Sequence, residues 1–511
     1  YLQDEWQITP RLTATYGVRF EMPFYLDKME NNPAIAALTF ADGQKMDVGT
    51  WPKSQLLISP RLGFNYDVLG DRSLQIRGGT GIFTGLLPFV WFTNQPTNSG
   101  MIQSPEIGWG PGNANLVGLD FHPDYKAFIQ ANPTLFPQNP GTLPAGSSLA
   151  EVGKDFKFPQ IWRSNIGVDV ELPWNTIFTV EAIYSKDINA ITQININEAA
   201  PAGHITGPDN RLYWTTKAVQ SSISSAMVLS NTHMGYQFSI TGQLTKNFTN
   251  GLSGMFAYTY TMAKDVTNNP GSSAYSAFSS NVAVGSLNDP GLSYSGFAVP
   301  HKLVGNLSYR IEYANHLATT LSVVYQGYQT GRWSYTYSND ANGDGISSDL
   351  MYIPNSQTEL QFVDYNGMTA TDQQTAFWNY LNRNKYLSAH KGEFAARYGE
   401  VRPWLHRFDA KLLQDIFSNF GDRKYTIQVS VDFLNIGNLL NDKWGAYVNN
   451  PLASFDNIRP LRVNNRGNAT AQPVYTLNAT SMQDFTSKTT IVRDVSTSST
   501  WGCLLGIRFI F

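Results

Sequence analysis

The sequence predicts an all-β protein, a transmembrane antiparallel β-barrel, and three observations lead to this fold class. Apolar and polar residues alternate with a period of two in many stretches, the pattern of strands with one apolar face. The connections between these stretches are short and long in turn. Charged residues make up 15% and aromatic residues 13% of the 511 residues, which suits neither a disordered chain nor an ordinary cytosolic enzyme.

The alternation predicts thirteen strands. In "RKYTIQVSVDFLNI", for example, the odd-numbered residues from Tyr425 to Phe433 are apolar, and the residues between them are mostly polar. The expected strands cover residues 1–9, 11–24, 55–67, 73–84, 158–171, 176–189, 233–246, 251–265, 295–311, 316–330, 405–416, 423–437 and 500–511.

The lengths of the connections predict where the protein resides. Six connections are short, and the other six are long, at 25–54, 85–157, 190–232, 266–294, 331–404 and 438–499. A soluble sandwich or propeller has no reason to keep every second connection tight. Outer-membrane barrels combine short periplasmic turns with long extracellular loops, so we expect a multi-pass protein of the cell outer membrane.

The two faces of the strands predict a lipid-facing surface and a lumen. Aromatic residues near strand ends are expected to form interfacial girdles, namely Trp6, Tyr16, Trp162, Trp174, Tyr258, Tyr309 and Phe511. The lumen is expected to carry Arg19, Glu21, Arg310, Arg407, Asp409, Lys411, Asp432 and Arg508. These charges either contact a plug or a passing substrate, or form a hydrated wall that is paired internally.

The strand count predicts that residues 1–511 are the C-terminal portion of a single larger barrel domain. Thirteen is an odd number, whereas bacterial single-chain barrels have an even number of strands. If the short turns are periplasmic, the first strand also begins outside the cell. Both difficulties disappear if a plug and the first strands lie upstream.

Several segments resemble TonB-dependent outer-membrane receptors. "YLQDEWQITPRLTATYGVRFE" is similar to a recurring strand pair of that family, and "SPRLGFNYDVLGDRSLQIRGGTGIFTGLLPFVW" is similar to the next hairpin in its Oar-like, SusC-related branch, typical of Bacteroidota. "FPQIWRSNIGVDVELPW", "VPHKLVGNLSYRI" and the terminal "GIRFIF" fit the same pattern. The resemblance implies a 22-stranded barrel with an N-terminal plug and a segment that contacts the TonB complex.

A calcium loop is predicted within the long connection 331–404. "DANGDG" places Asp340, Asn342 and Asp344 at alternate positions before Gly345, and the Ile346 carbonyl and Asp349 are further candidate ligands. The twelfth position is Met351 instead of a bidentate Glu, and flanking helices are absent, which excludes an EF-hand. The loop either holds a structural Ca²⁺ or is a tight Asn/Asp/Gly turn that binds no ion.

Two other features of the loops raise alternatives. Thr371 and Gln374 predict the start of a surface helix, which either packs over the barrel mouth or docks a partner. Connection 85–157 is rich in aromatic residues, which suit either capture of a ligand or packing of loop on loop: Trp91, Trp109, Phe121, Tyr125 and Phe136.

The predicted function is therefore transport and not catalysis. The chain carries no phosphate-binding loop, zinc-protease motif or nucleophile elbow, and its seven histidines are scattered. The resemblance implies TonB-dependent, energised uptake of an oligopeptide, a glycan or a metal chelate through a plugged barrel. The alternative is an outer-membrane scaffold or an assembly or secretion component that binds surface lipoproteins.

The expected partners follow from the same analysis. They are the lipid bilayer, the TonB complex through the N-terminal part, and a SusD-like or other surface lipoprotein. The net charge of −3 gives no reason to expect nucleic acid.

Overall fold

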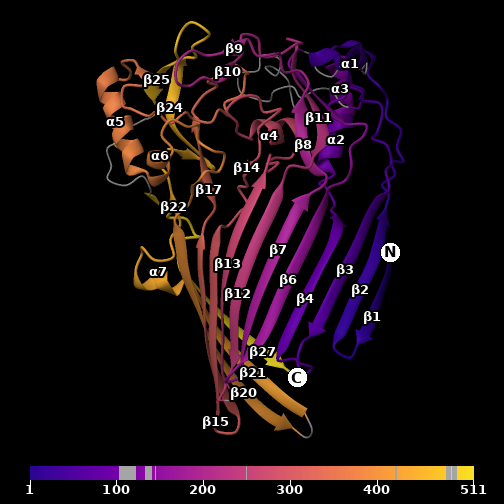
Figure 1. Ribbon diagram of the computed structural model, residues 1–511, viewed down its shortest axis with the longest axis vertical. Helices are drawn as coiled ribbons and strands as arrows, with labels where there is room; N and C mark the ends of the chain where they lie inside the picture. The colour runs from indigo at the N-terminus through magenta and orange to yellow at the C-terminus, as the bar shows by residue number, and fades with distance from the viewer. Residues whose placement is uncertain are drawn as a thin grey trace.

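The computed structural model shows a curved antiparallel sheet, here called the wall, with a thick layer of folded loops at one end, here called the cap (Figure 1). The structure describes residues 1–102, 122–132, 141–143, 145–248, 250–420, 423–478, 485 and 492–511. The C-terminus lies near the end of the wall that is far from the cap, and the N-terminus lies at the end of β1 that is nearer the cap.

The wall confirms all thirteen predicted strands. Each strand pairs with the next one along the chain, always antiparallel, as the predicted alternation of turns requires. The strands are β1 (Leu2–Thr9), β2 (Leu12–Glu21), β3 (Leu57–Asp67), β4 (Leu74–Thr84), β6 (Gln160–Leu172), β7 (Thr176–Asp187), β12 (Tyr236–Asn247), β13 (Leu252–Asp265), β15 (His301–Tyr313), β16 (Leu317–Gln329), β20 (Trp404–Phe420), β21 (Arg423–Leu434) and β27 (Gly502–Ile510). A short strand, β14 (Ser293–Tyr294), pairs with the end of β13.

The strand ends differ from the prediction where backbone chemistry decides. β15 begins at His301 and not at residue 295. Pro300 has no N–H to donate to the ladder, and the residues before Pro300 turn back beside β13. Two of the tight turns have a specific backbone conformation that was not predicted from the sequence. Trp174 and Asn175 both have positive φ, as do Ala314 and Asn315, which is the backbone of a type I′ hairpin.

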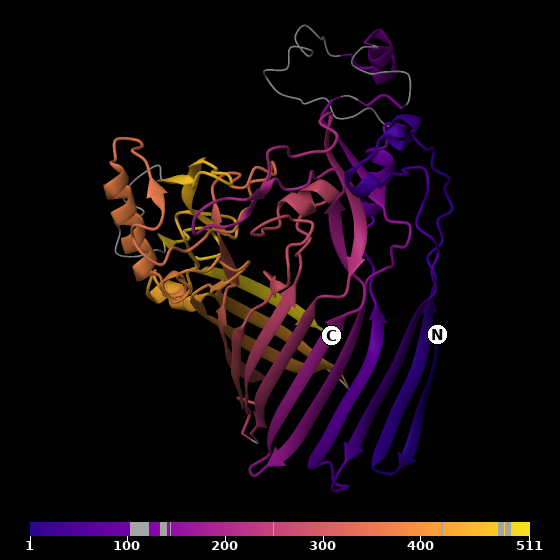
Figure 2. The ribbon, with the colours of Figure 1, turned by 45° about the horizontal axis from the view of Figure 1, so that its top comes forward.

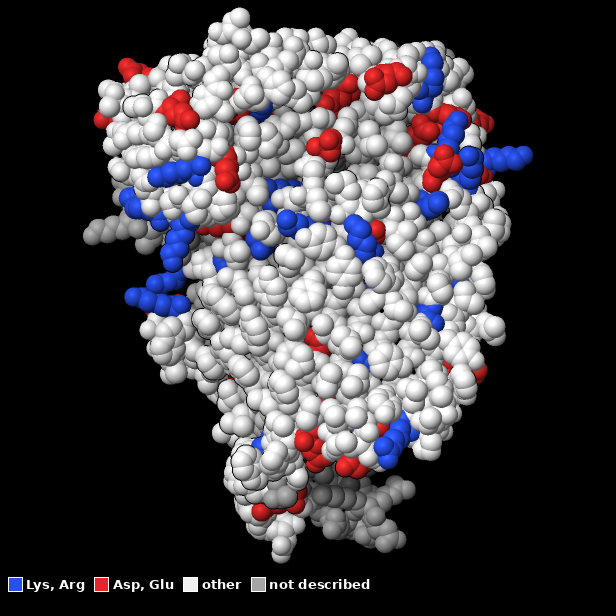
Figure 3. Space-filling view, viewed as in Figure 1, with Lys and Arg blue, Asp and Glu red and all other residues white. Residues whose placement is uncertain are grey.

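The two faces of the wall are chemically different. In β6, Ile166, Val168 and Val170 share one face, and Asp169 lies on the other, where it pairs with Arg77 of β4 at 2.9 Å. Figure 3 shows that charged residues are sparse along the strands and gather near both ends of the wall. All seven predicted girdle aromatics are exposed.

The wall curves into an open trough. Seen from the cap end, the strands pass from β1 at one edge around to β27 (Figure 2). These two strands end the pairing path and are not paired with each other in the described residues.

The cap contains its own small sheets. One joins β5 (Ser147–Val152), β11 (Ile223–Thr232) and β8 (Ala190–Asn195). A second comprises β17 (Arg332–Tyr337), β18 (Gln361–Phe362), β19 (Glu400–Val401), β23 (Ala453–Ser454), β24 (Asn457–Asn465) and β25 (Val474–Leu477). The cap also contains two separate strand pairs, β9 (Gly203–His204) with β10 (Leu212–Tyr213), and β22 (Val448–Asn449) with β26 (Val492–Arg493).

Short helices lie beside these sheets. They are α1 (Pro33–Ala37), the 3₁₀ turn Ala41–Gly43, α2 (Val90–Thr97), α3 (Tyr125–Ala131), α4 (Ala274–Ser279), α5 (Ala370–Arg383), α6 (Lys385–Ala389) and α7 (Ile436–Leu440). Among the described residues there is no helix with the length and apolar character needed to cross a membrane.

The largest buried apolar cluster belongs to the cap and not to the wall. It combines Trp333 and Tyr335 of β17 with Phe377 and Leu381 of α5, and with residues from Leu452 to Phe485. The predicted surface helix is therefore present and packs against the loops. Its N-cap is Thr369 and not Thr371, because the Thr369 side chain accepts the Asp372 N–H.

Candidate functional site in the loop cap

The predicted calcium loop follows β17 and is wound tightly around its own side chains. The Asp340 carboxylate accepts the N–H groups of Gly343 (2.6 Å) and Gly345 (3.1 Å). Asn342 accepts the Asp344 N–H, and Asp344 accepts the Ile346 N–H at 2.7 Å. Each contact is an Asx-type turn, in which a short polar side chain holds the backbone that follows it.

Both glycines of this loop have the left-handed backbone that the turn requires. Gly345 has a φ of +94°, which confirms the sharp turn expected there. Gly343 has a φ of +92°, and a Cβ at that position would lie 2.4 Å from the Trp214 carbonyl oxygen. The sequence analysis missed Gly343, because the close approach of Trp214 comes from a distant part of the chain.

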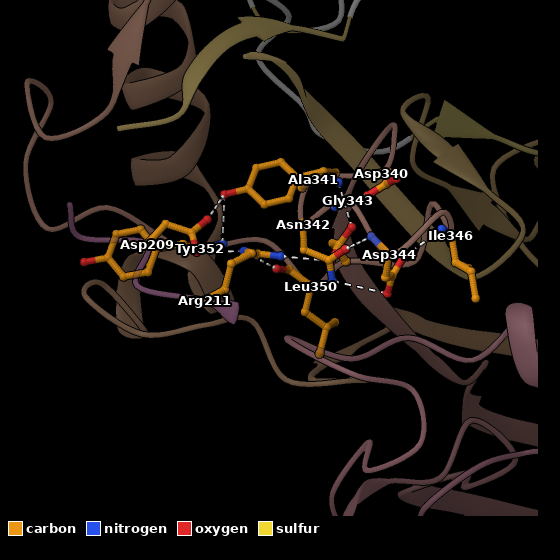
Figure 4. Close-up of polar contacts among 12 residues, drawn as sticks. Asp209, Arg211, Asp340, Ala341, Asn342, Gly343, Asp344, Ile346, Leu350 and Tyr352 are labelled. Atoms are coloured by element: carbon orange, nitrogen blue, oxygen red, sulfur yellow. Dashed lines mark hydrogen bonds and ion pairs between the residues drawn. The ribbon is translucent and has the colours of Figure 1, made fainter. Parts of the chain in front are cut away.

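Asp349 is tied to a buried arginine that sequence reasoning also missed. Its carboxylate accepts the Ala341 N–H at 2.8 Å and pairs with Arg211 at 3.3 Å. Arg211 also donates to Asp209 at 2.7 Å and to the Leu350 carbonyl oxygen at 2.7 Å. Figure 4 shows Arg211 reaching from the chain segment before β10 to the backbone beside the acidic loop.

The surroundings of Arg211 are apolar as well as charged. The guanidinium lies 4.9 Å from the Tyr337 ring centroid and 5.3 Å from that of Phe394. The Tyr337 hydroxyl donates to Asp209 at 2.8 Å. Burial alone would lower the pKa of Arg211, but Asp209, Tyr337 and Asp349 together outweigh this effect and raise it. Arg211 therefore stays charged inside the cap.

Burial makes the acidic residues hard to ionise. It raises the pKa of Asp344 to about 6, and the nearby Asp340 charge adds to this effect. Burial likewise raises the pKa of Glu198 to about 7, to which the Asp344 charge contributes. The Asp349 pKa is also raised by burial, against the opposing charge of Arg211.

The arrangement fits a calcium ion only in part. Asp340, Asn342 and Asp344 are brought together, whereas Asp349 is held by Arg211 and Asp340 also pairs with Arg466 at 3.0 Å. Across the described residues, no three side chains of His, Cys, Asp or Glu are grouped as a metal centre would require. The oxygens accept hydrogen bonds from backbone amides, and Asp349 and Asp340 each pair with an arginine.

Arginines, two of them buried and one exposed, join the long connections to one another. Arg211 links connection 190–232 to 331–404, and Arg466 links 438–499 to the same loop. Arg397 pairs with Asp265 at 3.0 Å and donates to the Val266 carbonyl oxygen, which fixes connection 331–404 to the top of β13.

A cavity of about 440 Å³ lies between α2, β5 and α4. Polar side chains on its lining include Asn94, Asn98, Ser148 and Ser273, and Tyr275 contributes an aromatic ring. Among the described residues that line it, none is charged. Amide and hydroxyl groups with one aromatic surface suit an uncharged ligand that forms many hydrogen bonds.

The aromatic residues of connection 85–157 divide between packing and exposure. Trp91 is buried with Leu87, Phe92 and Phe156, which supports packing of loop on loop at this position. Tyr125 is exposed on α3. Trp109, Phe121 and Phe136 lie outside the described residues.

The predicted lumen charges are largely paired along the wall. Arg19 pairs with Glu21, Arg407 with Asp409, and Lys411 with Asp432, all within 3.0 Å. Two acceptors were missed: Asp415 pairs with Arg310 at 2.6 Å, and Asp169 with Arg77. These contacts support the internally paired, hydrated wall.

Comparisons with known proteins complete the description of the chain. The family model described as "Outer membrane beta barrel domain" matches residues 1–459. No curated protein matches.

Several solved structures are similar to parts of the chain. The outer membrane transporter YddB from Escherichia coli is 11% identical, with a TM-score of 0.42 over 84% of this chain and 40% of that chain. A mutant of the ferric enterobactin receptor PfeA from Pseudomonas aeruginosa is 10% identical, with a TM-score of 0.37 over 85% and 38%. The siderophore receptor PiuA from Acinetobacter baumannii is 9% identical, with a TM-score of 0.35 over 93% and 40%. The chain thus spans about two fifths of the length of these structures.

Proposed function

The chain belongs to the outer membrane beta barrel domain family, and from this premise we propose that it forms part of a TonB-dependent transporter for a large nutrient. The wall is a membrane-spanning barrel wall, and its place is the outer membrane. Uptake would be energised through the TonB complex, which the N-terminal part of the whole protein would contact.

The observation that carries this proposal is the cap, which is folded and cross-linked at the mouth of a polar lumen. Loops that only shield a barrel have no need of a shared apolar core or buried ion pairs. A receptor, in contrast, has to hold capture groups in fixed positions. The paired charges of the lumen suit a wet passage or a plug surface.

The two open edges of the wall support a larger barrel. Unpaired N–H and C=O groups on β1 and β27 would be costly in hydrocarbon, so further strands are needed to close the sheet. Barrels of about 22 strands enclose a lumen wide enough for a plug. On this proposal about nine strands and a plug precede these residues.

The cavity between α2, β5 and α4 bears on the class of nutrient. Its uncharged amide and hydroxyl lining favours a peptide backbone or a glycan over an anionic metal chelate, which would need cationic partners. A SusD-like lipoprotein over the mouth would be consistent with either nutrient.

A scaffold or assembly role is the second candidate. The exposed apolar residues of α7 and the turn after it, Leu440 and Trp444, favour it, because they give a surface protein a place to bind. In that case loss of the protein would disturb surface lipoproteins and leave uptake unchanged.

Uptake assays separate the two roles. Cells with and without the intact protein would be given defined oligopeptides, oligosaccharides and ferric chelates, and depletion would be followed with and without a protonophore. Transport predicts that one class disappears only when both the protein and the proton gradient are present. Equal depletion in all strains, with surface lipoproteins lost from the deletion strain, would establish the scaffold role.

The acidic loop is proposed to hold a structural Ca²⁺. Asp340, Asn342 and Asp344 would be its side-chain ligands, with the Ile346 carbonyl and Asp349 as further candidates. The raised pKa values of the buried carboxyls support this, because a divalent cation would compensate their charge. The ion would stiffen connection 331–404 and take no part in transport itself.

A further inference from the structure

A row of aromatic and cationic side chains crosses the wall just below the cap. Direct cross-strand pairing places one residue from each of five neighbouring strands in this row: Trp162, Lys186, Tyr236, Lys264 and Tyr294. Adjacent strands lie about 4.8 Å apart, so the two lysines are separated by about 10 Å with an aromatic ring between them. The row therefore alternates aromatic and cationic groups.

The row belongs to the lipid-facing side of the wall. Side chains two residues apart on a strand share a face, so Lys186 lies on the same side as Ala182, and Tyr236 on the same side as Ile240. The paired charges Asp169 and Glu181 occupy the opposite, lumen side. Figure 3 shows basic side chains gathered where the sparsely charged wall meets the cap.

The two lysines of this row form no salt bridge within the described part of the chain. Lys264 lies 5.1 Å from the Tyr294 ring centroid. Arg332 lies over the same ring at 4.1 Å and donates to the carbonyl oxygens of Tyr398 and Gly399. Its Nε has no hydrogen-bond partner among the described residues.

The nearest acids point away from the row. Asp187 and Asp265 directly follow the two lysines in sequence, so alternation turns their side chains to the other face. Asp265 is engaged by Arg397 at 3.0 Å. The lipid-facing side thus has a surplus of positive charge at this height.

The next row toward the membrane centre has no charge. It contains Tyr184, Phe238 and Met262, which are paired with one another across β7, β12 and β13. A molecule lying against both rows would meet cations at one end and an apolar surface directly beneath. An anionic lipid has the matching arrangement, with a negatively charged headgroup at one end and apolar acyl chains beneath.

We infer that the row of Trp162, Lys186, Tyr236, Lys264 and Tyr294, together with Arg332, binds the phosphorylated headgroup of an outer-leaflet lipid. Ammonium and guanidinium groups form strong charge-assisted hydrogen bonds with phosphate, and the interleaved rings hold the cations at the interface. The acyl chains lie on Tyr184, Phe238 and Met262. A zwitterionic headgroup binds less well, because it brings its own positive charge.

Lipid binding to the intact receptor tests this inference. The receptor, purified from outer membranes in maltoside micelles, would be titrated with diphosphorylated lipid A and with fully dephosphorylated lipid A, and native mass spectrometry would count the bound lipids. The phosphorylated form should bind more tightly. The double variant Lys186→Gln/Lys264→Gln should bind it about 25-fold more weakly, which is about fivefold for each lysine.

Two further variants keep the result interpretable. Lys246→Gln is the matched control, because Lys246 lies on the same face of β12 at the opposite end, 4.7 Å from the Phe248 ring centroid. It should bind like the wild type. Lys186→Arg/Lys264→Arg retains the charges and should retain the lipid. Heat-modified gel mobility shows whether each variant is folded, so a loss of binding caused only by misfolding would be recognised.

Three outcomes would overturn the inference. One is equal affinity of the wild type and the Gln double variant for diphosphorylated lipid A, and another is equal affinity of the wild type for the two lipids. The third is displacement of the lipid by inorganic phosphate alone at millimolar concentration, which would identify a site for free phosphate and not for a headgroup.

Discussion

The Arg211 guanidinium donates to the Asp209 carboxylate over 2.7 Å where the two side chains are only 0% and 2% exposed. A buried pair of this kind is costly to break, because the partner that remains is a buried charge without compensation. Both residues belong to connection 190–232, and Arg211 also pairs with Asp349 of connection 331–404 at 3.3 Å, so Arg211 fixes one part of the cap to another.

Replacing this arginine should loosen the cap. Arg211→Met leaves Asp209 and Asp349 buried without a cation, so the local opening free energy of residues 200–213 and 335–352 should fall by about 3–5 kcal/mol. Hydrogen exchange of the purified protein measures this change in opening free energy. Lys53→Met, which breaks the exposed pair with Asp155, should leave exchange unchanged. Equal exchange in both variants would show that Arg211 does not hold the loops together.

The β5 region should become less stable as the pH rises through neutrality. Burial raises the pKa of Glu151 to about 7, and its carboxylate accepts the Asp47 N–H at 3.1 Å. The folded-state pKa of Glu151 lies above the unfolded value of about 4.5. The stability that the protonated Glu151 contributes is therefore fully present below about pH 4.5 and is lost as the pH rises to about 7.

A neutral isostere tests this pH dependence. Glu151→Gln keeps the acceptor and should stabilise the region at pH 8 by about 1–3 kcal/mol, with little effect at pH 5. Exchange rates of β5 corrected for intrinsic chemistry would show it, with Asp155→Asn as the exposed control. A wild-type profile that is flat from pH 5 to pH 8 would contradict the prediction.

The two left-handed glycines Gly343 and Gly367 should differ in their tolerance of alanine. Both have positive φ, but only at Gly343 would a Cβ meet a neighbour, the Trp214 carbonyl oxygen at 2.4 Å. Gly343→Ala should therefore destabilise connection 331–404 by about 1–3 kcal/mol more than Gly367→Ala. Limited proteolysis of the two variants under identical conditions gives the comparison. Similar cleavage rates would mean that the Trp214 backbone can move away from the added Cβ at little cost in free energy.

Calcium should protect connection 331–404 if the acidic loop binds it. Removing calcium with a chelator should speed proteolysis of this connection in the wild type but not in Asp340→Ala/Asp344→Ala, with an affinity of about 0.1–1 mM. Terbium luminescence sensitised by Trp214 gives an independent signal. Asp442→Ala, in another loop, should behave as the wild type. The ion-free turn is established if the chelator has no effect on the wild type.

The wall could be predicted from the sequence because its strands face two different environments. Alternation in "NIGVDVEL" locates β6 to within two residues, since lipid and lumen select different side chains at every step. β5 was missed because all but one of its residues are buried, so no alternation marks it. Most of the other cap strands are short, and several have their partners in distant connections.

The candidate site could be predicted only as far as local chemistry reaches. The turn around Asp340, Asn342 and Gly345 is encoded within a few residues. The pairing of Arg211 with Asp349 joins positions 138 residues apart, and no feature near either residue announces it. An isolated buried arginine is visible only once the fold has brought its partners together.

The composition of the cap core fixes an order of events during biogenesis. That core combines Trp333 and Phe377 with Phe485, and the Tyr475 hydroxyl donates to Asp209 at 3.4 Å. Since these partners come from separate connections, the cell-surface side cannot finish folding until the last of them has been exported. Insertion of β21 and β27, which flank connection 438–499, therefore precedes maturation of the cap, and an antibody specific for the assembled cap would report when that insertion is complete.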